Sequence, residues 1–483
     1  MSIAGTTDRS RVPITQIPGP HALPLLGWRS NMLALLRDPI NYMLWLHRTY
    51  GDVVALPRRN PRFVFVFAPE YNRQVLSDQM LFYNGEVNSP GSPVKLPPGS
   101  SAVRLFSGIT TRNGAKHVQQ RRLLMPAFHK KRIEALRDVM LERTERHIER
   151  WQPGRQVDLL SEMKGLTLAV AVQAILGLDP RHEGDRVRRV MERWFKLVLS
   201  YGVVAFPYDL PGTPFRRMLR SAERIDAEIR AMIRRRRTMG DGAAGLDALS
   251  MLLQAHDEDG TRLTDDELVG HTTALFVAGH ETTASALTWT LFLLAQHPRV
   301  LRDLLDELHG KLGGTPPTVE QLNDLPLLDA IIKESLRLFP PGLWFLRVNT
   351  APTNFGRYDI PEGTSILWSP AVVHRQPDLY PQPNAFKPER WSTIDPTPYE
   401  YMPFGAGPRR CLGATFAIME MKMVLPVILQ RFGIRLREGV QVDLGGSPLA
   451  TPRGGLPVRL TSPRRIPAPA RVRGNIRRLV DLP

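Results

Sequence analysis

Residues 404–413 read FGAGPRRCLG and lead directly into an apolar helical pattern from Ala414 to Leu429. This places Cys411, the one cysteine of the chain, at the N-terminus of a helix. A helix dipole and free backbone N–H groups stabilise a thiolate, so we expect a lowered thiol pKa and an anionic metal ligand. Gly405 and Gly407 permit the tight turn that aims those N–H groups at sulfur. Taken alone, however, a lone cysteine is most often an inert buried side chain.

A second segment, Thr264 to Gln296, predicts one long helix through the protein interior. It contains no proline, Thr264 and Glu267 form a capping box, and Pro298 follows its end. Its middle is apolar on nearly all sides, so any chemistry it carries is buried.

Residues 278–283 of this helix read AGHETT. Gly279 removes a side chain where a small molecule could sit, and an acid beside a hydroxyl, Glu281 and Thr282, is what a proton relay requires. The alternative is a polar kink in which a threonine bonds to its own backbone, and local sequence alone favours that alternative. A zinc-protease site is excluded, because its motif needs histidine at position 284 and the residue there is Ala284.

The rest of the chain predicts a mostly α fold with a small β-rich lobe. A Pro- and Gly-rich opening segment, 1–30, precedes a helix from Met32 to Tyr50 and a hairpin made by Val53 to Pro57 and Phe63 to Ala68. Residues 84–113 predict a long loop, a candidate functional lid. Further helical patterns cover 114–126, 130–151, 158–178, 183–202, 212–239 and 245–256, and sheet elements return around 344–368 and 433–460.

Composition limits the environment and the partners. A single cysteine in 483 residues excludes an intrachain disulfide and suits a reducing compartment, so we expect a cytoplasmic protein. No run of about 18 apolar residues predicts a membrane span. The net charge of +17, part of it in Arg234 to Arg237 and in the basic tail 461–483, would attract nucleic acid, anionic lipid or an acidic protein. A solvated face and a disordered tail explain the same charge.

The spacing Phe404-x-x-Gly407-x-Arg409-x-Cys411-x-Gly413 resembles the haem-binding signature of the cytochrome P-450 family, and residues 278–283 resemble its oxygen-activation motif. The resemblance runs from about residue 17 to residue 458. It implies the cytochrome P-450 fold, with haem b held between the long central helix and the helix after the cysteine loop. It also implies that Cys411 is the axial iron ligand, whose thiolate favours O–O cleavage.

The resemblance assigns the other site residues one by one. Glu281 is the catalytic acid and Thr282 the catalytic alcohol. Expected cofactor-binding residues are His117, Arg121, Ala278, Gly279, Arg347, Phe404, Gly405, Arg409 and Gly413. Of these, His117, Arg121, Arg347 and Arg409 would hold the two haem propionates. His117 stands where other members carry tryptophan, and without the resemblance each of the four would be an ordinary surface charge.

Glu334 and Arg337 lie three residues apart in a helical pattern from Leu327 to Leu338. They resemble the family's Glu-x-x-Arg pair, which is joined by an arginine from a later segment, here Arg390. The resemblance implies that this triad braces the haem side of the fold. Trp391 departs mildly from the family pattern, since many members have phenylalanine there.

The implied reaction inserts one atom of O2 into a hydrophobic small molecule, such as a terpene, steroid, fatty acid or polyketide. The candidate lining segments are the loop 84–113, Leu275 to Gly279, Pro341 to Phe345 and Leu449 to Thr451, and Leu343, Trp344 and Phe345 suggest a hydrophobic ligand. No nucleotide-binding glycine motif follows a strand, so a separate ferredoxin and ferredoxin reductase must deliver the electrons. A docking patch could comprise Lys116, Arg122, Lys130, Lys131 and Arg410.

We therefore expect one haem-thiolate monooxygenase domain, residues 31–460, that is monomeric, binds no nucleic acid and has no membrane span. Two alternatives remain open. A thiolate-haem isomerase would work without O2, which the intact pair Glu281 and Thr282 argues against. A haem sensor or basic nucleic-acid binder would explain the charge, although the sequence has no zinc finger or basic zipper.

Overall fold

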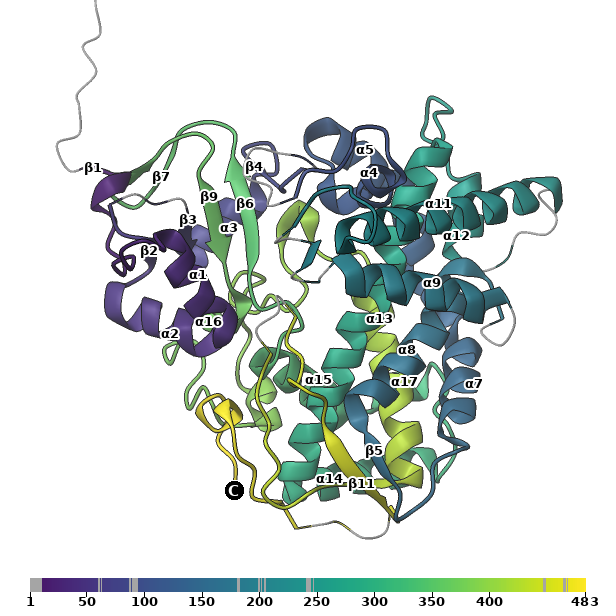
Figure 1. The fold of residues 1–483 in the computed structure, drawn as a ribbon. Coiled ribbons are helices and arrows are strands. Elements are labelled where there is room, and N and C mark those ends of the chain that lie inside the picture. The colour runs from purple at the N-terminus through teal and green to yellow at the C-terminus, as the bar shows by residue number, and fades with distance from the viewer. Residues whose placement is uncertain are drawn as a thin grey trace, which may run out of the picture.

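The helix predicted from Thr264 to Gln296 forms the centre of the molecule as α13, Asp265–Gln296 (Figure 1). Its capping box is present: the Glu267 N–H donates to the Thr264 hydroxyl at 3.3 Å, and the Thr264 N–H donates to the Glu267 carboxylate at 3.0 Å. Most side chains from Leu268 to Gln296 are buried. The prediction of a buried central helix is confirmed.

Helices form most of the remaining fold. The computed structural model describes residues 11–59, 61, 63–86, 88, 94–179, 183–198, 200, 202–203, 206–239, 245, 247–445, 449–463, 466 and 468–483. The helices outside the β-rich lobe include α5 (Gly114–Leu124), α6 (Lys130–Glu134), α7 (Arg137–Ile148), α8 (Leu159–Leu176), α9 (Glu183–Val198), α11 (Pro214–Met239), α12 (Ala248–Gln254), α14 (Pro298–Leu312), α15 (Pro326–Leu338) and α17 (Ala414–Arg431). The six ranges predicted between residues 114 and 256 contain their helices, while α15 and α17 extend one and two residues beyond their predicted ranges. The range 130–151 is divided because the Leu136 N–H donates to Ile133 in a tighter turn, at 3.0 Å.

The β-rich lobe lies on the left in Figure 1. Its five-stranded sheet has the order β2-β3-β9-β6-β4. The strands are β2 (Val53–Leu56), β3 (Phe63–Val66), β9 (Ser365–Trp368), β6 (Phe345–Asn349) and β4 (Phe82–Tyr83), and α3 (Pro69–Ser77) and α16 (Pro370–Val373) follow β3 and β9. The predicted hairpin is confirmed, with Val53 opposite Val66.

The single helix predicted from Met32 to Tyr50 is wrong in one respect. It is two helices, α1 (Trp28–Arg37) and α2 (Pro39–Tyr50). The break falls at Asp38, whose φ of −148° and ψ of 76° leave the helical region. Pro39 causes it, because a proline ring disfavours the helical conformation of the preceding residue.

Two small three-stranded sheets complete the fold. One has the order β1-β8-β7, made by β1 (Val12–Pro13), β8 (Tyr358–Ile360) and β7 (Thr353–Phe355). The other has the order β10-β11-β5, made by β10 (Gly433–Leu436), β11 (Pro457–Thr461) and β5 (Gln156–Asp158). In the second sheet a segment after α17 pairs with the strand that leads into α8, so it ties distant parts of the helical region together.

The long loop predicted over 84–113 contains regular structure. Residues Ser101–Phe106 form the helix α4, and Ile109–Thr111 form a 3-10 turn. Ser100 caps α4 by accepting a hydrogen bond from the Val103 N–H at 3.4 Å. A six-residue helix is too short to show a helical period in the sequence, and contacts with distant helices fix it instead.

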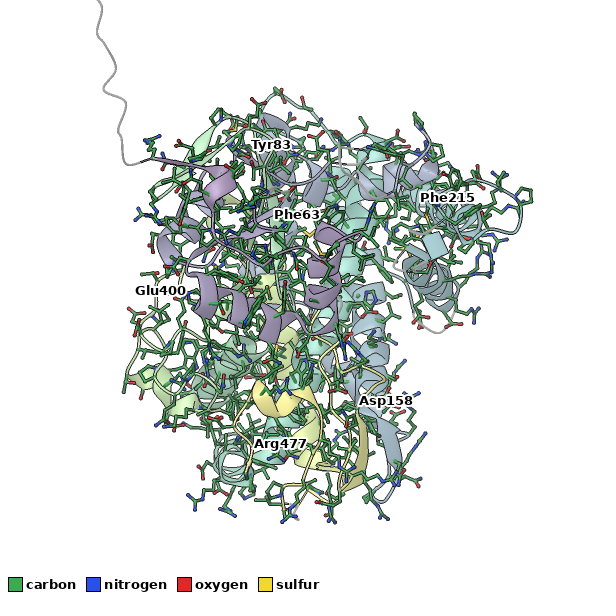
Figure 2. The ribbon with its side chains drawn as sticks, turned by 60° about the vertical axis from the view of Figure 1, so that its left-hand side comes forward. Phe63, Tyr83, Asp158, Phe215, Glu400 and Arg477 are labelled. Carbon is green, nitrogen blue, oxygen red and sulfur yellow. The ribbon has the colours of Figure 1, made fainter. Side chains whose placement is uncertain are left out.

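The disordered tail predicted for 461–483 is wrong for residues 468–483. Val472, Ile476, Leu479 and Val480 are buried in the main core, and η8 (Asn475–Arg478) forms a short turn. The buried Arg375 donates to Leu479 O at 3.1 Å. Figure 2 shows Arg477 on this segment, low on the body of the molecule. The high arginine content of the tail suggested disorder, although the apolar residues between the arginines pack into the core.

One described helix, α8, is long and apolar enough to cross a membrane. Two-thirds of its window, 67%, is buried inside the protein. Its neighbours are α13 and α7, so its apolar residues contact protein. The inner helix of a globular core has the same composition.

The carboxylate of Glu162 joins α8 to α7. It accepts hydrogen bonds from His147 at 2.8 Å, Arg150 at 2.7 Å and Trp151 at 3.0 Å. Burial alone would raise the pKa of Glu162, but these hydrogen bonds lower it to about 2. A depressed folded-state pKa means that the stabilisation is present above the ordinary value of 4.5 and is lost as pH falls toward 2.

The variant Glu162→Gln is expected to unfold at lower urea at pH 7, with a loss on the order of 2 kcal/mol. The difference from the wild type should shrink as pH falls below 4.5, because the carboxylate of the unfolded chain then takes up a proton while that of the folded protein stays ionised down to about pH 2. Urea titrations between pH 7 and pH 4 measure both effects. A difference that stays constant over this range would contradict the assigned network.

Candidate functional site

The cysteine loop is a tight turn held by its own backbone. Gly405 and Gly407 have φ of 66° and 68°, a left-handed conformation that favours glycine. The Cys411 N–H donates to Phe404 O at 2.9 Å, and α17 begins at Ala414 with Gly413 as its N-cap. A Cβ on Gly407 would lie 2.1 Å from Leu76 O, so only glycine lets the loop pack against α3. The predicted turn is confirmed.

The Cys411 side chain is accessible although protein surrounds it on most sides. Burial raises the pKa of the Cys411 thiol, and the Gly413 N–H, Arg121 and Arg410 oppose that rise without cancelling it. The expected lowering of this pKa is therefore wrong for the protein groups acting alone. A thiolate at this position requires a positive charge directly at sulfur, which a bound metal ion supplies.

Four predicted propionate partners form one positively charged cluster. Desolvation, Arg409, Arg121 and Arg347 together lower the pKa of His117 to about 4. Burial and Arg409 lower the pKa of Arg347 to about 10. Burial and Arg121 likewise lower the pKa of Arg409 to about 10, against an opposing effect of Tyr83. Within the described ranges, no carboxylate forms an ion pair with Arg121, Arg347 or Arg409.

Backbone and amide contacts position these cations. Arg409 donates to Arg112 O and to Asn113 Oδ1, both at 2.8 Å. Arg121 of α5 donates to Arg410 O at 2.8 Å, which joins α5 to the cysteine loop. His117 Nδ1 lies 2.9 Å from Gln79 Oε1. The sequence interpretation missed Arg112 and Gln79, because neither occupies a position in a short motif.

Buried nitrogen atoms without partners also surround this cluster. The Nε atoms of Arg112 and Arg409 are buried and form no hydrogen bond with the protein groups that the structure describes. Buried donors of this kind are rare unless a bound group accepts their hydrogen bonds. Together with the cations, they fit a ligand that carries carboxylates.

The residues of the motif at 278–283 lie on two faces of α13: one is accessible, and the other packs against α8. Ala278 is exposed although most of α13 is buried, and Thr282 lies one turn further along the same face. The Thr282 hydroxyl donates to Ala278 O at 2.6 Å. A Cβ on Gly279 would lie 3.2 Å from Ile175 Cδ1 of α8. Gly279 therefore allows close packing of α8, which differs from the prediction that it leaves room for a small molecule.

Glu281 has a partner that the sequence did not indicate. Lys164 of α8 lies 2.7 Å from its carboxylate, and His280 Nε2 lies 3.8 Å from it. Its side chain is mostly buried, at 15% exposed, while that of Lys164 is 37% exposed. The predicted catalytic acid is therefore paired with a lysine that is itself in contact with solvent. It lies 117 positions earlier in the chain, which is why no local motif contains it.

The predicted triad is confirmed. Glu334 and Arg337 are fully buried and joined by two hydrogen bonds, of 2.8 and 2.9 Å. Arg390 donates to Glu334 at 2.9 Å, and Arg337 also donates to His374 O at 2.8 Å. Trp391 donates its indole N–H to Glu334 at 3.1 Å, a bond that phenylalanine cannot make.

Two of the four predicted lining segments, Pro341 to Phe345 and Leu449 to Thr451, meet beside α13. Gly342 bridges to Leu449, and the Ala450 N–H donates to Pro341 O at 2.8 Å. Ser285 and Trp289 of α13 both donate to Ala450 O. Phe345 is partly exposed and stacks on Trp368, with ring centroids 4.6 Å apart. The two segments therefore meet beside Ser285 and Trp289 of α13.

These residues fit the haem that the resemblance implies. An accessible thiol at Cys411 suits a metal, the cations without carboxylate partners suit acidic side groups, and the small Ala278 suits a flat ring beside α13. Every group comes from an element that the fold fixes in place. The chemistry of the donors therefore agrees with an iron macrocycle that carries two carboxylates.

Comparisons with known proteins agree with this fit. The family model of cytochrome P-450 matches residues 17–452. Cyclooctatin synthase of Streptomyces melanosporofaciens is 34% identical over 89% of this chain and 94% of its own length. Cyclooctat-9-en-7-ol 5-monooxygenase of the same organism is 33% identical over 88% and 90%. The solved structure of retinoic acid bound cyanobacterial CYP120A1 has a TM-score of 0.78 and 28% identity, over 92% of this chain and 98% of that one.

The match spans the cysteine loop, α13 and the triad. Members of this family carry haem b with a cysteine thiolate on the iron. The chain belongs to the cytochrome P-450 family and is a haem-dependent monooxygenase.

Proposed function

We propose that this enzyme inserts one oxygen atom from O2 into a hydrophobic small molecule of the terpene class, with Cys411 as the axial iron ligand. The observation that carries the proposal is the accessible Cys411 thiol beside a cluster of arginines that form no ion pair with any carboxylate in the described part of the chain. Bound haem would supply the activation of O2. The second oxygen atom leaves as water, which consumes two electrons and two protons.

The chain's own residues hold the cofactor and exclude water. Arg121, Arg347 and Arg409 would neutralise the two propionates, and their mutual repulsion would be relieved when those carboxylates bind. His117 would donate a hydrogen bond to a propionate as a neutral imidazole. Phe404, Gly405 and Gly413 shape the turn around the thiol. Arg337 and Arg390, through Glu334, fix the segment that precedes the loop.

Proton delivery is assigned to Glu281 and Thr282. The Thr282 hydroxyl lies on the accessible face of α13, while the Glu281 carboxylate lies against Lys164. For Glu281 to pass a proton to the oxygen side, its side chain must turn from Lys164 toward Thr282. We infer that Lys164 holds the acid on the solvent side between turnovers.

The variant Glu281→Gln is expected to lower the rate of product formation about 100-fold, because the amide cannot carry a proton. Substrate affinity should stay unchanged, since Glu281 faces α8. Thr283→Val is the matched control: Thr283 is buried, and its hydroxyl also bonds one turn back, to Gly279 O at 3.3 Å. Single-turnover rates with matched reductant measure both variants. An equal loss in the two variants would contradict the assignment.

The substrate class rests on the lining and on the relatives. Trp344 and Phe345 are accessible apolar side chains in this segment, whereas Leu343 is fully buried in the main core. Several relatives have names that refer to terpene oxidation, among them the pentalenene oxygenase of Streptomyces avermitilis, which is 29% identical over 88% of this chain. A terpene hydrocarbon has an apolar surface, and a terpene alcohol adds only a hydroxyl group to it. Such a molecule suits an apolar lining.

The electrons are proposed to come from a ferredoxin and its reductase in the cytoplasm. Three members of the predicted docking patch are engaged within the protein: Lys116 with Glu267, Arg122 with Asp257 and Lys130 with Glu134. Lys131 and Arg410 are exposed, and Arg410 adjoins Cys411. The docking surface is therefore proposed to centre on Arg410. Residues 31–460 are proposed as one catalytic domain.

The experiment is turnover of a panel of cyclic terpenes, steroids and fatty acids with isotope-labelled O2, ferredoxin, ferredoxin reductase and NADPH. We expect a product that contains one labelled oxygen atom and depends on the reductant. A rearranged product that forms without O2 or reductant would show an isomerase instead. Products from fatty acids or steroids alone would overturn the terpene class and leave the monooxygenase assignment in place.

A further inference from the structure

A buried aspartate fixes the short helix α4 to α11. Asp226 of α11 is 4% exposed. Its Oδ2 atom accepts hydrogen bonds from Ser101 at 2.8 Å and from Arg104 at 2.6 and 3.0 Å, and both donors belong to α4. An ion pair on an exposed helix surface contributes little to stability, whereas these three hydrogen bonds meet at one buried oxygen atom.

The same aspartate extends the network to a third helix. Asp226 Oδ1 accepts a hydrogen bond from Arg230 at 2.8 Å, and Arg230 also pairs with Asp266 in the first turn of α13. Two guanidinium groups therefore share one carboxylate. Without its charge, Arg104 and Arg230 would repel each other, so the network depends on Asp226.

The position of α4 over α13 is close and depends on small residues. A Cβ on Gly108 would lie 2.6 Å from Gly270 O and 2.8 Å from Ala274 Cβ. Gly270, Ala274 and Ala278 follow at intervals of four, so they share one face of α13. The segment after α4 therefore ends one turn before the accessible Ala278. Figure 1 shows α4 beside α11 at the top of the molecule.

We propose that Asp226 is a positioning residue that holds α4 as a roof over the substrate side of α13, and that it thereby sets how fast bulky ligands enter and leave. The inference rests on the proposed function for the location of the substrate. Its structural part, the fixing of α4 by Asp226, is independent of that function. The side chain of Asp226 contacts Ser101, Arg104 and Arg230, so Asp226 acts through α4.

The first test is amide hydrogen exchange of the haem-loaded protein. In Asp226→Asn, exchange over residues 101–111 is expected to rise about tenfold. Asp247→Asn is the matched control, because Asp247 is also buried and also pairs with an α11 arginine, Arg236 at 3.3 Å, but it caps α12. Its effect should fall on residues 248–254. Unchanged exchange over 101–111 in Asp226→Asn would overturn the proposal.

The second test compares a small and a bulky iron-binding azole. In Asp226→Asn, clotrimazole is expected to dissociate about tenfold faster while the dissociation of imidazole stays within about twofold. Asp226→Glu should restore part of the slow release, since it keeps the charge. An equal change for both azoles, or none for clotrimazole, would overturn the role in ligand passage.

The two tests distinguish a failure of the proposed function from a failure of the role assigned to Asp226. A protein that binds no azole would refute the proposed function, whereas the exchange result would still decide the role of Asp226. Should Asp226→Asn fail to bind haem, Ser101→Ala removes one of the three bonds and is expected to raise exchange over 101–111 about threefold. No change in that variant would count against the proposal.

Discussion

Replacing Glu334 by alanine is expected to destabilise the protein by about 3–5 kcal/mol and to prevent stable haem binding. Glu334 is fully buried and accepts hydrogen bonds from Arg337, Arg390, Trp391 and the Lys387 N–H. Its removal leaves two buried guanidinium groups without a counter-charge. Urea unfolding and the haem content of the purified variant measure the loss.

The control for this prediction is Trp391→Phe. That variant loses only the 3.1 Å hydrogen bond to Glu334 and keeps an aromatic ring, so its cost should be about 1.5 kcal/mol. Haem binding should survive. Equal losses in the two variants, or a Glu334→Ala protein as stable as the wild type, would contradict the bracing role of the triad.

Replacing Cys411 by serine is expected to lower monooxygenase activity by at least about 10³-fold, equal to about 4 kcal/mol of barrier. A hydroxyl replaces the thiolate that donates electron density to iron, while the shape of the loop is kept. The expected result is a folded variant that fails to turn over. Turnover with the reconstituted electron-transfer chain measures the change.

A change in the cation cluster serves as the control for this second prediction. Arg121→Gln removes one propionate partner and should weaken haem retention without abolishing activity, because His117, Arg347 and Arg409 remain. Activity of Cys411→Ser close to that of Arg121→Gln would contradict a direct role of the thiolate.

The sequence predicted most of the fold because its signals are local. The boundaries of α13 follow from the capping box at Thr264 and Glu267 and from Pro298 after its end. The turn at Gly405 and Gly407 follows from residues that permit a left-handed backbone. The triad followed from the family resemblance, since an i, i+3 pair alone does not indicate a buried partner such as Arg390.

The sequence did not predict features that depend on distant residues. Helix α4 is fixed by Asp226, more than 100 positions away. Lys164 meets Glu281 only because α8 packs on α13. The tail is ordered because Ile476 and Leu479 reach the main core, although its composition is basic. The direction of the Cys411 pKa depends on burial, which the helix-dipole argument omitted.

The most direct measurement of the central claim is the carbon monoxide difference spectrum of the reduced protein, recorded beside that of Cys411→Ser. The account predicts a strongly red-shifted Soret band in the wild type and its loss in the variant, because only a thiolate ligand produces that shift. An unchanged band in the variant, or a wild type that binds no haem, would contradict Cys411 as the iron ligand.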